Sequence, residues 1–222
     1  MEKKYYEAYE ERYRTVHNKG LRWSSDENSP IVMEIIKKYN ITSQHRLLEI
    51  GCGEGRDSRT VLDNGFNLMA TDISNQAIEY CKKEMPDYKD SFSVLNCLND
   101  DLDELFDFIY GIAVIHMLVI DEDRERFYQF IYEHLNTKGM ALICTMGDGE
   151  IEMQSDISQA FTLQEREHES GKIIVAGTSC RMVSFKTFEE EIKRNRLEII
   201  EKGITNALPN FNSLMYVVVK KK

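Results

Sequence analysis

The feature that most constrains this chain is a glycine-rich turn between a short apolar segment and a helical one. Residues 46–50 read Arg-Leu-Leu-Glu-Ile and run directly into Gly-Cys-Gly-Glu-Gly, and helical spacing begins near Asp57. In an open parallel sheet, ligands bind beyond the carboxyl ends of the strands, near the reversal of strand order. Glycines there let a ligand approach the backbone without meeting a Cβ atom. The segment therefore predicts a nucleoside or nucleotide site.

The rest of the chain alternates between apolar segments of strand length and amphipathic helical segments. The expected strands lie near residues 46–50, 66–71, 92–95, 108–114, 140–144, 197–202 and 214–219, the fifth of them after a turn at Lys138-Gly139. Expected helices begin at Pro30, near Asp57, after Ser74, at Asp121, and at a capping box formed by Thr187 and Glu190. This alternation predicts an α/β fold with a seven-stranded, mostly parallel, doubly wound sheet and helices on both faces.

Two stretches depart from this alternation. Residues 1–28 contain aromatic side chains among charges, and residues 147–182 form a long excursion after the fifth strand. Excursions of that length in a compact domain are usually lids or binding loops. We expect a single domain over residues 1–222, with residues 1–28 as an N-terminal arm and residues 147–182 as a lid insertion. Tyrosines 5–13 fit either one packed helix face or, with Trp23, a cover for a ligand.

Composition excludes several classes of protein. The formal net charge is -10 and no basic stripe is present, which disfavours a nucleic-acid partner. No apolar run reaches the roughly 20 residues that span a bilayer, and the polar N-terminus has no signal-peptide core. Five cysteines without a CxxC pair predict neither a disulfide framework nor a metal site. We expect a cytoplasmic protein without a membrane partner, either a monomer or a homodimer.

Asp72 follows the second expected strand, 21 residues after Gly51. A carboxylate at that place can accept hydrogen bonds from both hydroxyls of a ribose. Two residues distinguish this site from that of an NAD(P)-dependent oxidoreductase. Arg56 replaces the third small residue of the dinucleotide fingerprint. Glu49, just ahead of the first glycine, is a poor neighbour for phosphate and suits a ligand end with a positive charge.

Four segments within residues 47–145, LLEIGCGEGRDS, ATDIS, FDFIYGIAVIHML and LNTKGMALI, resemble the successive motifs of class I S-adenosylmethionine-dependent methyltransferases. The pattern is also similar to the small-molecule branch with thiopurine and tellurite-resistance methyltransferases. The resemblance implies the Rossmann-like methyltransferase fold, S-adenosyl-L-methionine as cofactor and methylation of a small-molecule acceptor. Residues 110–113 lack the Pro-Pro-aromatic motif of enzymes that methylate nucleobase amines, which disfavours DNA as acceptor.

The resemblance also implies a set of cofactor-binding residues. Glu49, Gly51 and Gly53 would surround the methionine part, Asp72 the ribose and Ile73 the adenine. The remaining members would be Cys52, Asn96, Cys97, Gly111, Ile112 and His116. Two aromatic residues of the arm, Tyr13 and Trp23, are further cofactor-binding candidates. Because the insertion leaves the carboxyl end of the fifth strand, Asp148, His168 and Arg181 are substrate-binding candidates.

Alternatives stay open at this stage. His116 fits a pocket residue or, less readily, a group that transfers a proton. The charges of residues 147–182 also fit a solvated loop. The rival functions are a non-catalytic module that binds S-adenosylmethionine or another nucleoside, and the oxidoreductase that Glu49 and Arg56 weaken.

Overall fold

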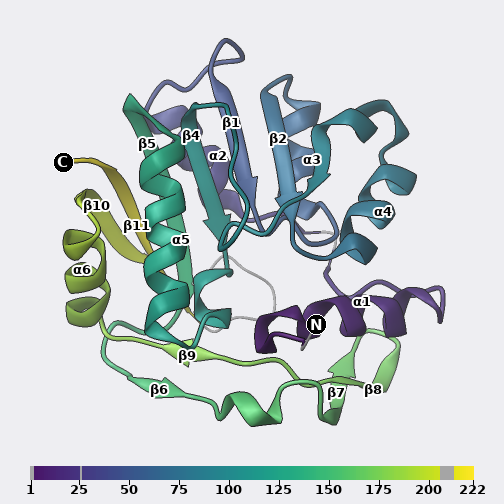
Figure 1. Ribbon diagram of the computed structural model, residues 1–222. Coiled ribbons are helices and arrows are strands. Elements are labelled where there is room, and N and C mark those ends of the chain that lie inside the picture. Colours follow the sequence, from purple (N-terminus) through teal and green to yellow (C-terminus); the bar gives the residue numbers. More distant parts are fainter. Residues whose placement is uncertain (1–2, 26, 206–212) are drawn as a thin grey trace.

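The computed structural model describes residues 3–25, 27–205 and 213–222. Its main sheet has seven strands in the order β10-β11-β5-β4-β1-β2-β3 (Figure 1). The strands are β1 (Arg46–Ile50), β2 (Asn67–Asp72), β3 (Phe92–Val94), β4 (Phe106–Ile112), β5 (Leu135–Met146), β10 (Leu197–Thr205) and β11 (Leu214–Lys221). All paired neighbours are parallel except β11, which is antiparallel to β5 and to β10. The predicted mostly parallel sheet is confirmed.

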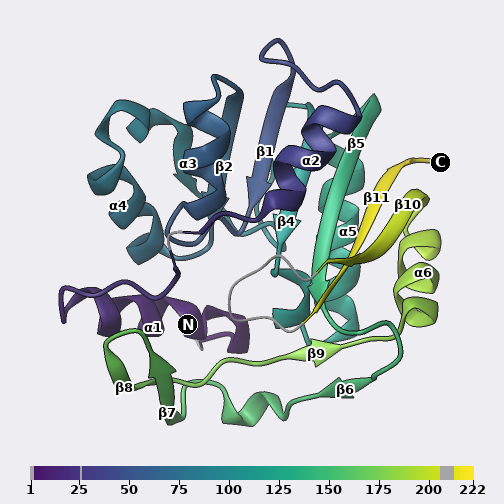
Figure 2. The same cartoon turned by 180° about the vertical axis from the view of Figure 1, so that it is seen from behind.

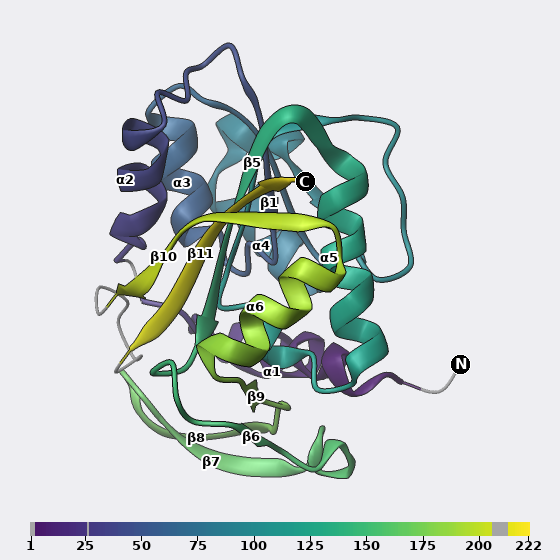
Figure 3. The same cartoon turned by 90° about the vertical axis from the view of Figure 1, so that its left-hand side faces the viewer.

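Helices cover both faces of this sheet. They are α2 (Pro30–Lys38), α3 (Arg56–Asp63), α4 (Asn75–Glu84), α5 (Asp121–His134) and α6 (Phe185–Arg194), whereas α1 (Ala8–His17) lies beyond the strand ends. Single 3-10 turns are η1 (Tyr5–Glu7), η2 (Pro86–Ser91), η3 (Ile115–Met117) and η4 (Ile157–Gln159). One apolar cluster lies between the sheet and α5 and α6 (Figure 3). The other lies under α2, α3 and α4 on the opposite face (Figure 2). Among the described residues, no helix is long and apolar enough to cross a membrane.

Two predicted boundaries are wrong. Helix α6 is capped by Ser184, whose hydroxyl accepts a hydrogen bond from the backbone N–H of Thr187, so Thr187 lies in the first turn. The predicted turn at Lys138-Gly139 lies inside β5, which begins at Leu135. A Cβ at Gly139 would lie 3.0 Å from two carbonyl oxygens of the neighbouring chain segment. Gly139 lies where the register of β4 with β5 shifts, between the pairs Phe106–Leu135 and Phe108–Met140, so the glycine allows a close approach at a strand irregularity.

The arm is more regular than the sequence predicts. Helix patterning was expected only from Ser29, yet η1 and α1 lie before it and bury Tyr5, Tyr6 and Tyr13. Tyr5 and Tyr6 belong to η1 and Tyr13 to α1, and a role of these tyrosines as a cover for a ligand stays a prediction. Charged residues separate the tyrosines in the sequence, and one of them, Arg12, is itself buried, which weakens the apolar pattern of this ten-residue helix.

The insertion has structure of its own. Its strands are β6 (Met153–Gln154), β7 (Leu163–His168), β8 (Gly171–Ala176) and β9 (Arg181–Met182), and β7 and β8 form an antiparallel hairpin. Helix α1 and the insertion lie together beyond the carboxyl ends of β1, β2 and β4 (Figures 1 and 2). Buried Arg12 of α1 joins the two, because its guanidinium donates two hydrogen bonds to the carbonyl of Ala176 at 3.0 and 2.7 Å.

Candidate functional site

The glycine-rich turn uses backbone conformations that favour glycine. Gly51, Gly53 and Gly55 have φ values of +74°, +54° and +78°. A Cβ at Gly51 would collide with the side chain of Val114, and one at Gly53 would lie 2.8 Å from the hydroxyl oxygen of Tyr13. The turn therefore has space for a backbone only, and the arm lies directly against it.

Asp72, at the carboxyl end of β2, faces this turn. Its two oxygens accept hydrogen bonds from the backbone N–H groups of Gly53 and Ser74, both at 2.8 Å. Burial raises the pKa of Asp72 to about 6, against the effect of these two bonds, and the charge of Glu10 adds to the rise. A carboxylate has about four lone-pair sites, so Asp72 can still accept bonds from a ligand.

Glu49 lies deeper beneath the turn. One of its oxygens accepts hydrogen bonds from the hydroxyls of Ser58 at 2.5 Å and Tyr110 at 3.0 Å. Burial, followed by the charge of Asp57, raises the pKa of Glu49 to about 8. A positively charged ligand group nearby would lower this pKa and favour the carboxylate.

The arm is attached to the turn through Glu54, a residue that the sequence analysis missed. Its carboxylate accepts bonds from the backbone N–H of Trp23 at 2.8 Å and of Ser24 at 2.6 Å, and from the Ser24 hydroxyl at 2.7 Å. It also contacts His17 Nε2 at 2.8 Å. Although burial alone would raise the pKa of Glu54, these bonds hold it below its usual range. The sequence offers no signal for this role, because the partners of Glu54 lie 30 residues or more away in the chain.

The two predicted arm residues lie differently. Tyr13 is buried at the turn, whereas the ring of Trp23 lies under the guanidinium of Arg12, 4.6 Å away, and beside His168 of the insertion. Trp23 therefore reaches the turn through its backbone and joins arm and insertion through its ring.

The side chains after β2 and β3 form the next part of the site. Half-buried Ile73 lines a cavity of about 220 Å³ together with arm residues and Phe161 of the insertion. Asn96 accepts a bond from the backbone N–H of Leu98, so its carbonyl oxygen shapes the turn after β3. Burial raises the pKa of the Cys97 thiol to about 12 and that of the Cys52 thiol well above its usual value. Both thiols are protonated at neutral pH, which fits pocket lining rather than nucleophiles.

The carboxyl end of β4 brings Gly111, Ile112 and His116 to the same edge of the sheet. A Cβ at Gly111 would meet Phe127 of α5 at 3.5 Å and the carbonyl oxygen of Ile50 at 3.6 Å, which are ordinary van der Waals distances. His116 is buried in η3. Burial, assisted by the charge of Arg124, lowers the pKa of His116 to about 4. Its imidazole is therefore neutral at physiological pH and a weak base.

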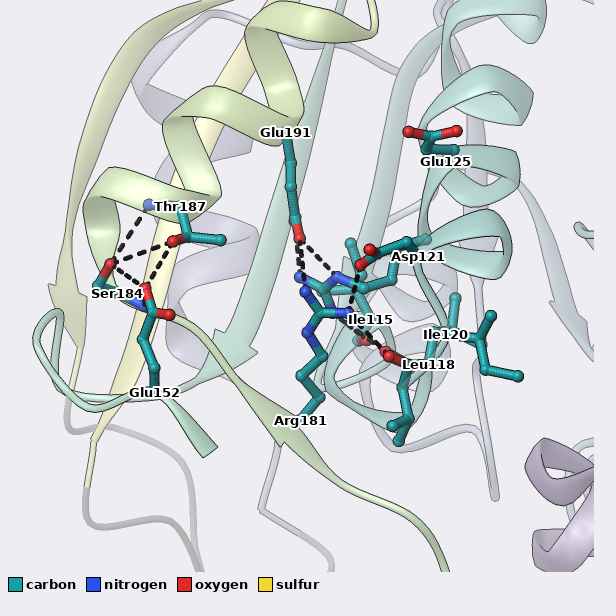
Figure 4. Close-up of polar contacts among 12 residues, drawn as sticks. Ile115, Leu118, Ile120, Asp121, Glu125, Glu152, Arg181, Ser184, Thr187 and Glu191 are labelled. Carbon is teal, nitrogen blue, oxygen red and sulfur yellow. Dashed lines mark hydrogen bonds and ion pairs between the residues drawn. The ribbon is translucent and has the colours of Figure 1, made fainter. Parts of the chain in front are cut away.

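A buried ion pair holds η3 in place. Arg124 of α5 donates hydrogen bonds to the carbonyls of Ile115 and Leu118 at 2.9 and 3.2 Å. The same guanidinium donates two bonds to the carboxylate of Glu191 in α6, at 2.8 and 2.7 Å (Figure 4). The carboxylate also accepts a bond from Tyr128 at 2.8 Å.

The three substrate-binding candidates lie apart from one another. Asp148 is exposed and accepts bonds from the backbone N–H groups of Glu150 and Ile151. His168 contacts the carbonyl of Arg22 at 2.6 Å. Arg181 donates to the carbonyl of Val119 at 2.8 Å and to Asp121 at 2.5 Å (Figure 4). Of the three, Arg181 lines an open cavity of about 490 Å³ between the insertion and the start of α5. A substrate role for any of them stays a prediction.

The described part of the chain contains no group of three His, Cys, Asp or Glu side chains that could hold a metal ion. The five cysteines are free thiols.

Comparison with known proteins finds methyltransferases. Residues 48–141 match a family model described as "Methyltransferase domain". The chain is 30% identical over 120 residues to a ubiquinone biosynthesis O-methyltransferase from Rickettsia felis, which is 52% of this chain and 47% of that protein. The chain therefore matches about half the length of this curated relative.

Solved structures share the fold at low sequence identity. The glycopeptide N-methyltransferase MtfA in complex with S-adenosyl-L-methionine gives a TM-score of 0.66 at 15% identity, over 88% of this chain and 95% of that chain. A TehB-like methyltransferase from Corynebacterium glutamicum gives 0.60 at 19% identity, over 98% of both chains. The predicted Rossmann-like methyltransferase fold is confirmed.

Proposed function

We propose that this chain transfers a methyl group from S-adenosylmethionine to a small-molecule acceptor. Residues 48–141 match a methyltransferase domain, and the fold is the class I, Rossmann-like methyltransferase fold. The observation that carries this proposal is Asp72, buried beside the left-handed glycine turn and bonded to Gly53 of that turn. The relatives that support it are an O-methyltransferase of ubiquinone biosynthesis and a glycopeptide N-methyltransferase. The net charge of -10 favours a small acceptor over a nucleic acid.

The residues present fit this cofactor. Asp72 retains acceptor capacity for the ribose hydroxyls, and Ile73 offers an apolar surface beside a cavity for the adenine. Glu49 and the backbone at Gly51 and Gly53, which the side chains of Val114 and Tyr13 approach closely, would receive the methionine part. Gly111, Ile112 and His116 would lie on the side of the reacting centre, with Asn96, Cys52 and Cys97 as further lining.

The bound cofactor would supply an electrophilic methyl group on a sulfonium. The contribution of this chain is then positioning and exclusion of water. The arm and the insertion already pack on each other at this edge, so they can exclude water from it. His116, neutral and weakly basic, suits a wall of the site better than a general base. We further propose that the chain acts as one cytoplasmic domain, with residues 147–182 contributing to the acceptor site.

We expect the substitution Asp72→Asn to weaken binding of S-adenosylhomocysteine by about 1.5–3 kcal/mol, the usual contribution of hydrogen bonds to a charged group. Asparagine keeps the size of the side chain but loses the charge and one oxygen acceptor. Isothermal titration calorimetry measures the change. The control is Asp63→Asn, since Asp63 is the last residue of α3 and lies outside the site. Equal affinity of wild-type protein and a folded Asp72→Asn variant would contradict this role.

Binding should also depend on pH through Asp72. Since the pKa of Asp72 is about 6 in the ligand-free structure, the carboxylate prevails above pH 6 and the neutral acid below it. A diol that donates hydrogen bonds prefers the carboxylate, so ligand binding lowers this pKa. The contribution of Asp72 to the affinity for S-adenosylhomocysteine is therefore expected to be constant above about pH 7 and to fall, by up to tenfold per pH unit, below pH 6. Glu49, whose pKa of about 8 a positively charged ligand group lowers, adds a dependence near pH 8 that wild-type protein and Asp72→Asn share. Calorimetry between pH 5 and 8 tests this, and Asp72→Asn should lack the transition near pH 6. The same transition in that variant would assign it to another group.

A further inference from the structure

Helix α1 places a second carboxylate beside Asp72. One oxygen of Glu10 accepts hydrogen bonds from the hydroxyl of Ser74 at 2.6 Å and from the backbone N–H of Gln76 at 3.1 Å. Both donors belong to the start of α4, two and four residues after Asp72. The other Glu10 oxygen accepts a bond from Arg14 at 3.0 Å. Glu10 is thus fixed over the strand end that holds the predicted ribose-binding residue.

The two carboxylates influence each other. The charge of Glu10 contributes to the raised pKa of Asp72, after burial. Like charges that approach in a partly buried site are unfavourable unless hydrogen-bond donors or positive charge lie beside them. Asp72 already accepts two hydrogen bonds from backbone N–H groups. Glu10 accepts hydrogen bonds from Ser74, Gln76 and Arg14. The orientation of each carboxylate is therefore set before a ligand binds.

The space beside Glu10 is open to a ligand, and Asp72 lies one residue before Ile73 without lining that space itself. Glu10 and Ile73 line the same cavity of about 220 Å³, which extends toward Phe161 of the insertion. Ile73 lies between Asp72 and Ser74 in sequence. A nucleoside whose base packs on Ile73 would present its ribose to the edge that Asp72 and Glu10 border. A vicinal diol has two hydroxyl donors, and two carboxylates from different elements can each accept a hydrogen bond from one of them.

We propose that Glu10 is a specificity-determining residue of the cofactor site, where it accepts one ribose hydroxyl while Asp72 accepts the other. This assignment rests on the proposed function, since it requires a ribosyl ligand at the glycine turn. Its consequence is that α1 belongs to the binding site and closes on the diol. The arm would then select ligands that have both hydroxyls.

The test compares four ligands on the full chain by isothermal titration calorimetry: S-adenosylhomocysteine, adenosine, 2′-deoxyadenosine and 3′-deoxyadenosine. Wild-type protein should bind adenosine about tenfold more tightly than either deoxynucleoside, as expected for one hydrogen bond to a charged group. Glu10→Ala should lose the discrimination against one deoxynucleoside and retain that against the other. Glu10→Gln keeps an acceptor and should be intermediate. Its affinity for S-adenosylhomocysteine should fall less than that of Glu10→Ala.

Glu79→Ala is the control, because Glu79 is an exposed glutamate on α4 that does not line this cavity. Circular dichroism verifies that each variant is folded. Unchanged discrimination in Glu10→Ala, or tighter binding of S-adenosylhomocysteine, would overturn the role of Glu10 and leave the proposed function intact. Failure of wild-type protein to bind S-adenosylhomocysteine would overturn the proposed function, and the assignment of Glu10 with it.

Discussion

Replacement of Glu191 by alanine is expected to lower the free energy of unfolding by about 3–5 kcal/mol, the usual effect of removing one partner of a buried ion pair. Glu191 is 4% exposed and its partner Arg124 is 1% exposed, so water cannot replace the lost carboxylate. The substitution leaves a buried guanidinium charge and the hydroxyl of Tyr128 without this acceptor.

Urea unfolding followed by circular dichroism measures the change. Glu190→Ala is the matched control: the neighbouring glutamate is exposed, so its replacement should change the free energy of unfolding by less than about 0.5 kcal/mol. Glu191→Gln retains acceptor oxygen and should lie between the two. Equal stability of the Glu191→Ala and Glu190→Ala proteins would contradict the role of this ion pair.

The Glu191 variant also bears on the site. Through Arg124, the carboxylate of α6 fixes the carbonyls of Ile115 and Leu118 on either side of His116. Arg181 of the insertion approaches the same carboxylate at 3.9 Å and bonds to the segment that follows η3. A single buried group therefore supports both the segment after β4 and the insertion. Through this carboxylate, residues far apart in sequence fix the conformation of the chain at the carboxyl end of β4.

Much of the fold could be predicted from local patterns. Three local signals agree on the strand at residues 46–50, the glycine turn and the helix after it: the hydrophobic period, the flanking glycines and the length of each segment. The structure has these elements at the predicted places. Ser74 shows the cap that its position predicts, with a bond from the backbone N–H of Ala77. These features are set by residues within a few positions of one another, which a sequence displays directly.

Features that depend on distant residues could not be predicted. Helix α1 has its apolar face completed by the β7–β8 hairpin, more than 140 residues later, as the packing of Val16 with Ile173 and Val175 shows. In the sequence, Glu10 and Glu54 look like ordinary surface charges. Their hydrogen-bond partners, Ser74 and Gln76 for Glu10 and Trp23 and Ser24 for Glu54, become evident only in three dimensions. Thr187 satisfies the capping-box pattern, but Ser184 takes the cap because its hydroxyl reaches the Thr187 N–H.

The central claim is that the glycine turn, Asp72 and the arm bind S-adenosylmethionine and its product. Thermal unfolding with S-adenosylhomocysteine, S-adenosylmethionine, NAD and NADP in parallel tests it most directly. A ligand that binds only the folded chain stabilises it by about 4.1 kcal/mol at 1,000 times its dissociation constant. For a chain of this size that corresponds to a rise in Tm of about 8–16 °C. We expect such a rise with S-adenosylhomocysteine and none with NAD or NADP; a rise with NAD or NADP and none with S-adenosylhomocysteine would contradict the account.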